Sequence, residues 1–365
     1  MALTAGIVGL PNVGKSTLFN AITKAGALAA NYPFATIDPN VGIVEVPDSR
    51  LDKLTEMVQP KKTIPTTFEF TDIAGIVKGA SKGEGLGNKF LSHIREVDAI
   101  CQVVRAFDDD NVTHVSGRVD PVDDIEVINM ELVLADLESV EKRLPKAEKM
   151  AKQKDKDAVN EARILARIKE ALEEGNPVRS LEFNDDDQKF VNQAQLLTSK
   201  EMLYIANVGE DEIGDEDNEK VKLIREYASK EDSEVIVISA KIEEEIATLE
   251  DEDREMFLED LGIEEPGLDR LIRTTYDLLG LATYFTAGVQ EVRAWTFISG
   301  MTAPQCAGII HTDFERGFIR AEVTSYDDYV EFNGENGAKD AGKQRLEGKE
   351  YIMKDGDVVH FRFNV

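Results

Sequence analysis

Short apolar runs alternate with helical patterns through most of the chain. Residues 4–8 form an apolar run that enters a glycine-rich loop, and residues 16–22 continue with helical spacing. Such short runs are typical of strands in a sheet that is covered on both faces. The alternation predicts a doubly wound α/β sheet. Four further runs of this kind lie at residues 68–71, 99–104, 202–206 and 235–238.

The interval 129–199 interrupts this alternation. Its apolar residues recur at helical spacing among charged ones, which predicts two long amphipathic helices. We expect them to form an antiparallel hairpin inserted into the sheet domain, with residues 142–156 at or near its tip. The apolar positions are Leu132, Leu134, Leu137, Val140, Ile164, Leu165, Ile168 and Leu172.

The pattern changes again after about residue 281, to strands and turns punctuated by glycine. Apolar strand patterns cover residues 292–297, 318–323 and 358–363. They predict a separate small α+β domain. We therefore expect one domain over residues 1–280, including the helical insertion, and a second over residues 281–365.

Charge is distributed unevenly along the chain. The formal net charge is -29, and residues 209–264 hold 22 acidic against 6 basic residues. Binding to nucleic acid depends on Lys and Arg displacing counterions, so we expect no DNA partner. Residues 142–156 are the exception, with seven basic and two acidic residues. We call residues 142–156 the basic segment.

Several sequence features favour a cytoplasmic protein. No apolar run approaches the roughly 18 residues of a membrane span, and the N-terminus lacks a basic segment before its first apolar run. The two cysteines are too few for a disulfide framework. We expect Cys101 in a buried strand and Cys306 in a loop of the C-terminal domain.

The segment Gly9-Leu10-Pro11-Asn12-Val13-Gly14-Lys15-Ser16 matches the P-loop pattern, and it has a strand before it and a helix after it. In this motif backbone N–H groups cradle phosphates, Lys contacts their oxygens and the Ser hydroxyl binds Mg²⁺. The sequence therefore predicts a nucleoside triphosphate site.

Two further segments fit the Mg²⁺ and γ-phosphate end of such a site. Asp72-Ile73-Ala74-Gly75 follows an apolar run, with Asp72 near the Mg²⁺ shell and the Gly75 N–H available to the γ-phosphate. Thr36 is the candidate first-switch ligand to Mg²⁺. A plain turn threonine is the alternative interpretation of Thr36.

The segments expected near the base differ from those of ordinary GTPases. GTPases carry Asn-Lys-x-Asp after a strand, whereas this chain has Asn207-Val208-Gly209-Glu210. The missing Lys and the longer acid undermine guanine recognition, because buried polar groups left unpaired cost about 1–3 kcal/mol. This departure favours ATP, with GTP weaker. Ser239-Ala240-Lys241 fits the last base-contacting loop.

The residue after Gly75 is Ile76, where many GTPases have the Gln that orients water. The candidate catalytic residues are then Lys15, Asn12 and His114. Asn12 could hold a monovalent cation such as K⁺ against the phosphates, and His114 could position the attacking water. A surface histidine without such a role is an equal alternative for His114. The four histidines are scattered without metal-ligand spacing, so Mg²⁺ is the expected divalent metal.

With these motifs in place, the chain closely resembles the Obg-like ATPases of the YchF family from end to end. The resemblance implies a P-loop G domain with a helical insertion and a C-terminal ubiquitin-like β-grasp (TGS) domain. It also implies Mg²⁺ ligands at Ser16 and Thr36, a phosphate loop over residues 12–17 and a catalytic histidine at His114. Family members are associated with ribosomes and with stress responses.

The leading hypothesis is a Mg²⁺-dependent ATPase switch that binds the ribosome or its large subunit and modulates translation or a stress response. Ribosomal RNA contact would come from the basic segment and the C-terminal domain, although a charged helix pair is also typical of a solvated face. One alternative is a GTP-specific translation factor. Another is a nucleotide-gated scaffold whose turnover is incidental.

Overall fold

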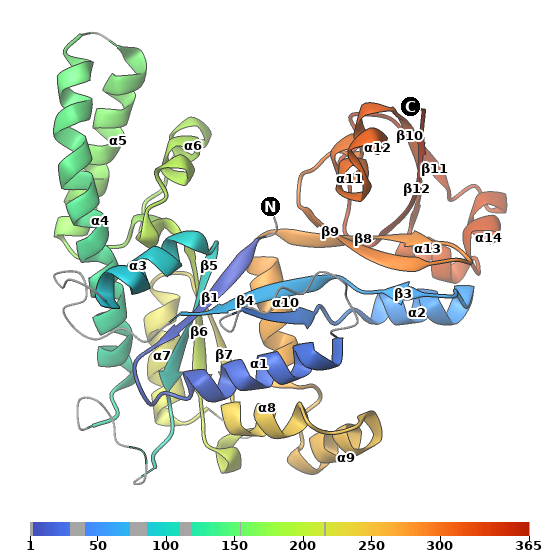
Figure 1. The fold of residues 1–365 in the computed structure, drawn as a ribbon, viewed down its shortest axis with the longest axis horizontal. Helices are drawn as coiled ribbons and strands as arrows, with labels where there is room; N and C mark the ends of the chain where they lie inside the picture. Colours follow the sequence, from blue (N-terminus) through green and yellow to red (C-terminus); the bar gives the residue numbers. More distant parts are fainter. Residues whose placement is uncertain are drawn as a thin grey trace. The chain divides into compact units, whose positions relative to one another are not determined.

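The computed structural model describes residues 3–29, 41–73, 86–109, 112, 118–153, 155–214 and 217–364. Three predicted site residues, Thr36, Gly75 and His114, lie outside these ranges. The chain divides into two compact units, drawn in Figure 1. The first comprises Met1–Val44 and Glu69–Leu271, and the second Glu45–Phe68 and Ile272–Val365.

The first unit is built on a six-stranded sheet in the order β2-β4-β1-β5-β6-β7. Strand β1 pairs parallel with β4 and β5, and the parallel pairing continues through β6 to β7. All seven residues of β5 are buried, as expected for a central strand covered on both faces. The strands are β1 (Thr4–Gly9), β2 (Val41–Glu45), β4 (Thr67–Asp72), β5 (Ala99–Arg105), β6 (Glu201–Asn207) and β7 (Glu234–Ile238).

Helices cover both faces of this sheet, so the predicted doubly wound fold is confirmed. Helices α1 and α8 pack together on one side of the strands, and α4 packs against α7 on the other (Figure 1). Helix α10 runs from the first unit's part of the chain into the second's. The helices are α1 (Lys15–Ala29), α3 (Leu86–Glu96), α7 (Glu219–Ser229), α8 (Ala240–Ile246), α9 (Asp251–Leu261) and α10 (Gly267–Leu278).

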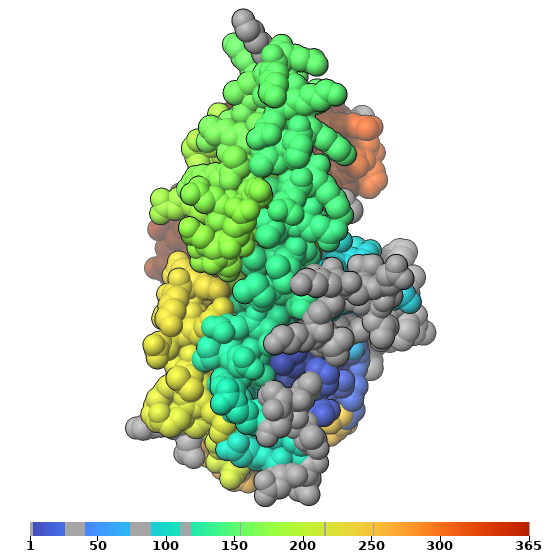
Figure 2. Space-filling view, turned by 90° about the vertical axis from the view of Figure 1, so that its left-hand side faces the viewer, coloured from blue at the N-terminus to red at the C-terminus, as the bar shows by residue number. Residues whose placement is uncertain are grey.

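The helical insertion forms the antiparallel hairpin that the spacing predicted. Its long helices are α4 (Pro121–Ala151) and α5 (Lys156–Glu173), and they project from the sheet (Figure 1; green in Figure 2). The first helix begins earlier than residue 129, because the Asp120 side chain caps it and Pro121 suits its first turn. The short helix α6 (Asp185–Ala194) completes the insertion and shares its apolar core.

The second unit has its own six-stranded sheet, in the order β11-β10-β12-β8-β9-β3. Strands β8 and β9 form an antiparallel pair, and β12 joins β8 in parallel. The strands are β3 (Thr63–Ile64), β8 (Leu281–Ala287), β9 (Val292–Ile298), β10 (Phe318–Ser325), β11 (Arg345–Glu347) and β12 (Asp357–Phe363). The helices are α2 (Ser49–Val58), α11 (Ala303–Ile310), α12 (Thr312–Arg316), α13 (Tyr326–Glu331) and α14 (Glu335–Asp340).

The segment Glu45–Phe68 is part of this second unit. Its strand β3 pairs parallel with β9, Thr63 opposite Val292. Its helix α2 buries Leu51 and Leu54 in one apolar cluster with Phe285, while the neighbouring Tyr284 enters the cluster on the other face of the sheet. The compact units therefore differ from the segments 1–280 and 281–365 that the pattern suggested.

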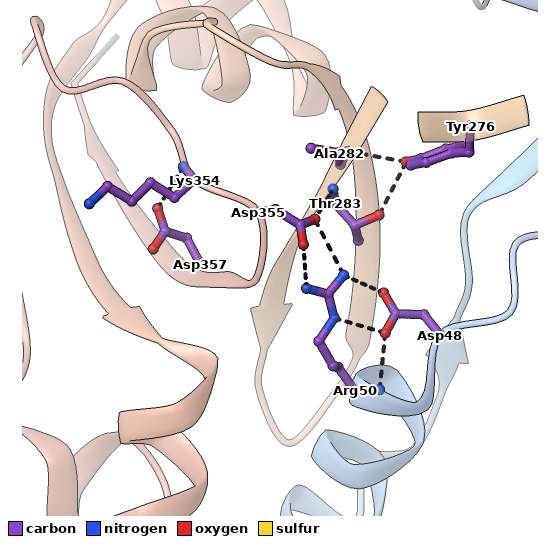
Figure 3. A network of polar contacts seen from close by, with 8 residues as sticks. All are labelled: Asp48, Arg50, Tyr276, Ala282, Thr283, Lys354, Asp355 and Asp357. Carbon is purple, nitrogen blue, oxygen red and sulfur yellow. Dashed lines mark hydrogen bonds and ion pairs between the residues drawn. The ribbon is translucent and has the colours of Figure 1, made fainter. Parts of the chain in front are cut away.

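A polar network fixes the start of α2 within the second unit (Figure 3). The Arg50 guanidinium donates to Asp48 at 2.9 and 2.8 Å and to Asp355 at 2.6 Å. Asp355 also accepts from the Thr283 backbone N–H at 2.8 Å. Burial lowers the pKa of Arg50, but the two carboxylates raise it overall, so the ion pairs persist over the ordinary pH range.

Both cysteines of the chain are buried. Cys101 is buried in β5 as predicted, but the loop expected for Cys306 is wrong. Cys306 lies in α11 among apolar side chains, and burial raises the pKa of its thiol to about 12. Among the described residues, no helix has the length and apolar character that spanning a membrane requires.

Candidate functional site

The glycine-rich loop connects β1 to α1 and has the backbone form of a phosphate cradle. Asn12 and Gly14 have positive φ angles of 64° and 95°, and α1 begins at Lys15. Consecutive N–H groups in such a turn point the same way, and the free N–H groups of a helix N-terminus favour anions. The loop can therefore bind phosphate oxygens through its backbone.

Asn207, at the end of β6, joins this loop to the rest of the site. Its side-chain amide donates to the Val13 carbonyl at 2.8 Å, and its carbonyl oxygen accepts from the Ala240 N–H at 2.9 Å. A Cβ at Gly14 would lie 2.0 Å from the Asn207 amide nitrogen. The approach is close enough that only glycine fits at position 14.

These loops enclose a hollow of about 950 Å³ at the carboxyl ends of the parallel strands. This is the edge at which doubly wound sheets bind ligands. Val13 is buried beneath the hollow. The predicted nucleotide-binding residues that line it are Asn12, Gly14, Lys15, Ser16, Thr17, Asn207, Val208, Glu210, Ser239 and Ala240.

The phosphate end holds the groups expected to meet Mg²⁺. The Lys15 ammonium forms an ion pair with Asp72, which lies opposite Ile7 at the end of β4. Ser16 is exposed at the start of α1. Hydroxyl and carboxylate oxygens are the hard ligands that Mg²⁺ prefers, and a neighbouring lysine suits an additional anion. The described residues at this end therefore fit a Mg²⁺–phosphate group.

The base end holds two features that sequence reasoning did not anticipate. The Glu210 carboxylate forms an ion pair with Lys241, which lies in the first turn of α8. The Ser239 hydroxyl is buried and has no hydrogen-bond partner among the described residues. A buried hydroxyl without a partner is unfavourable, so this one is available to a bound molecule.

A third loop, after β5, also lines the hollow; the sequence had connected it with the site only through His114. Phe107, Asp108, Asp109 and Val112 contribute to it. The buried Arg105 shapes this loop by donating to the carbonyls of Phe107, Asp109 and Val112 at 3.2, 3.1 and 2.8 Å. The sequence contained a signal for this loop, because it follows β5, another parallel strand that ends at the same edge of the sheet.

One group in the second unit offers metal-binding atoms. His360, Glu322 and Glu335 each have a donor atom within 4.8 Å of the others. Arg362 donates to both Glu322 oxygens at 3.2 and 3.1 Å, and Gln344 donates to Glu335 at 3.2 Å. Both carboxylates are therefore already engaged by neighbouring side chains.

Comparison with known proteins agrees with the architecture of the site. Residues 4–134 match a family described as a 50S ribosome-binding GTPase, and residues 281–364 match the C-terminal YchF GTPase family, described as a protein of unknown function (DUF933). The structure of the Schizosaccharomyces pombe YchF GTPase superposes with a TM-score of 0.91 at 41% identity, covering 99% of this chain and 97% of that one.

Curated relatives match over the full length of both chains. The protein named "Ribosome-binding ATPase YchF" from Bacillus subtilis is 72% identical, and the one of that name from Escherichia coli O157:H7 is 57% identical, each over 100% of both chains. Identity at this level over whole chains indicates shared descent and a shared fold. The chain belongs to the YchF family.

Proposed function

We propose that this protein is a Mg²⁺-dependent P-loop ATPase that binds ribosomes. The observation that carries the ATPase proposal is the hollow at the sheet edge, where the phosphate loop, the Lys15–Asp72 pair and the base-end loops converge. The name of the relatives, ribosome-binding ATPase, supports both halves of the proposal. We also propose that it acts in the cytoplasm, where ribosomes are found.

Each predicted residue has a role in this proposal. The backbone of residues 12–17 binds the phosphates, and Lys15 exchanges its Asp72 partner for phosphate oxygens. Ser16, Asp72 and Thr36 would hold Mg²⁺, which neutralises charge on the phosphates when bound. The Gly75 N–H would bind the γ-phosphate.

Water activation is proposed for residues other than a glutamine, since Ile76 follows Gly75. His114 would position the water, and Asn12 would hold K⁺ against the phosphates. The loop shaped by Arg105 leads toward His114 in the sequence, which supports a role for this segment.

Preference for ATP over GTP is proposed from the departure of Asn207-Val208-Gly209-Glu210 from the guanine-binding motif. The Asn207 amide bonds to the protein at Val13 and Ala240, and it keeps one N–H and one oxygen lone pair for a base. Val208, Ser239 and Ala240 would then surround the base, with Glu210 at its edge.

Contact with ribosomal RNA is proposed for the tip of the α4–α5 hairpin and for the C-terminal domain. The basic side chains of the described tip are exposed, and Figure 1 shows the hairpin projecting from the sheet. Exposed Lys and Arg bind the phosphate backbone by releasing counterions. The exposed basic residues are Lys142, Arg143, Lys146, Lys149, Lys152 and Lys156.

Hydrolysis assays test the proposal directly. ATP and GTP turnover would be measured with and without Mg²⁺, K⁺ and ribosomes, and we expect Mg²⁺-dependent ATP turnover that ribosomes alter. A tenfold or greater preference for GTP would overturn the ATPase assignment in favour of a GTP-specific factor. A variant with Lys146→Glu, Lys149→Glu and Lys152→Glu should co-sediment less with ribosomes. Unchanged co-sedimentation of this variant would overturn the RNA contact at the hairpin tip.

A further inference from the structure

The ion pair between Glu210 and Lys241 stands where a nucleotide base would be read. Glu210 follows β6 and Lys241 follows β7, and these adjacent parallel strands bring both side chains to the hollow. Asn207 holds the two loops together through the Ala240 N–H. The backbone on which the pair stands is therefore held in place at the base end.

The chemistry of the two purines makes the state of Glu210 important. The Watson–Crick edge of guanine presents two N–H donors side by side, which a free carboxylate accepts together. Adenine presents one donor beside a ring-nitrogen lone pair, which a free carboxylate repels. A carboxylate engaged by an ammonium group loses acceptor capacity and its repulsion for that lone pair.

We propose that Lys241 is a specificity-determining residue, which disfavours GTP relative to ATP by engaging the Glu210 carboxylate. This rests on the proposed ATPase function and names a residue that enforces it. Lys241 acts through Glu210, by occupying the acceptor that a guanine edge would use. Such selection against the competitor is a common part of specificity.

The surroundings of Lys241 keep its side chain protonated. The pKa of Lys241 is raised, first by its hydrogen bond to Glu210 and then by the negative charges of Glu210, Glu245 and Asp109. Both side chains remain accessible, at 64% for Lys241 and 44% for Glu210. Exposed ion pairs are weak, so we expect Lys241 to change the ratio of affinities by about two- to fivefold.

The test compares equilibrium binding of non-hydrolysable ATP and GTP analogues by calorimetry. In Lys241→Met the ratio of GTP to ATP affinity should rise about two- to fivefold, whereas Lys241→Arg should keep the wild-type ratio. In a Glu210→Gln background the Lys241→Met change should have no effect on the ratio. Lys222→Met is the matched control, because Lys222 forms a similar exposed pair with Glu219 at 2.9 Å.

The dependence of the GTP-to-ATP affinity ratio on salt is a second test, because a purely structural role of Lys241 would leave this ratio unchanged. Raising NaCl from about 0.05 M to about 1 M screens the exposed pair, so the wild-type ratio should approach that of Lys241→Met. An unchanged ratio in Lys241→Met, or an equal change in the Glu210→Gln background, would overturn the role of Lys241. Wild-type protein without any preference for ATP would instead overturn the ATP assignment itself.

Discussion

The two ends of the nucleotide hollow are built in different ways. At the phosphate end the cradle is one continuous segment, Gly9–Ser16, that offers mainly backbone N–H groups, and Asp72 joins it from the end of β4. The base end is assembled from residues 107–109, 207–211 and 239–244, which follow three neighbouring parallel strands. Phosphate binding therefore depends on local backbone form, whereas base selection depends on which side chains the sheet brings together.

Replacing Gly14 should have the largest effect on ATP affinity, because it disturbs the phosphate loop. Gly14→Ala adds a Cβ 2.0 Å from the Asn207 amide nitrogen at a positive φ angle. Strain of about 1–3 kcal/mol and the added clash should weaken ATP binding on the order of 100-fold. Calorimetry with an ATP analogue measures this change.

Gly262→Ala is the control for Gly14→Ala. Gly262 also has a positive φ angle, but a Cβ there meets nothing within 4 Å. This variant should lose stability and keep its affinity for ATP. Equal affinity of Gly14→Ala and wild type would contradict the close approach of the two loops.

Asn207→Ala should damage both ends at once. It leaves the Val13 carbonyl and the Ala240 N–H without partners, at about 1–3 kcal/mol each, so affinities for ATP and GTP should fall together, about tenfold or more. Asn207→Asp keeps the acceptor for Ala240 and should show an intermediate loss. A change in the ATP-to-GTP ratio alone would mean that Asn207 contacts the base.

Arg105→Met should loosen the base end more mildly. It removes the donors to three loop carbonyls, and we expect faster hydrogen exchange at residues 106–109 and about a fewfold weaker nucleotide binding. Arg167→Met is a matched control, because Arg167 also donates to a carbonyl, Glu182 at 2.8 Å, and lies over the Phe183 ring. Unchanged exchange in Arg105→Met would rule out this role.

The smallest effect concerns Glu243, in the helix after the base loop. Burial raises the pKa of Glu243, although hydrogen bonds from the Leu268 and Gly267 N–H groups oppose the shift. With a folded pKa above the ordinary 4.5, its contribution to stability is full below pH 4.5 and is lost as the pH rises through the folded pKa.

Chemical unfolding across this pH range tests that sign. The free energy of unfolding should fall more steeply above pH 4.5 in wild type than in Glu243→Gln. Glu245→Gln, at an exposed neighbouring position, should follow the wild-type slope. A parallel slope for Glu243→Gln would contradict the shifted pKa.

Much of the fold was predictable because its signals are local. The strands of the first unit, the hairpin of α4 and α5 and the C-terminal strands follow apolar periodicity. Strand β3 was not predictable, since it has two residues and its partner Val292 lies far along the chain. Helix α2 shows an ordinary amphipathic pattern, which does not reveal that it covers Phe285.

The sequence by itself determined the phosphate loop and the family, because the residues of a contiguous motif are neighbours in the chain and need no tertiary contact to come together. It also gave the candidate base residues Asn207 and Glu210, but not how they are used. Only the tertiary structure decided that Asn207 ties loops together and that Glu210 pairs with Lys241. The physical reason is that parallel strands bring distant residues to one edge, and a side chain's partners there depend on strand order.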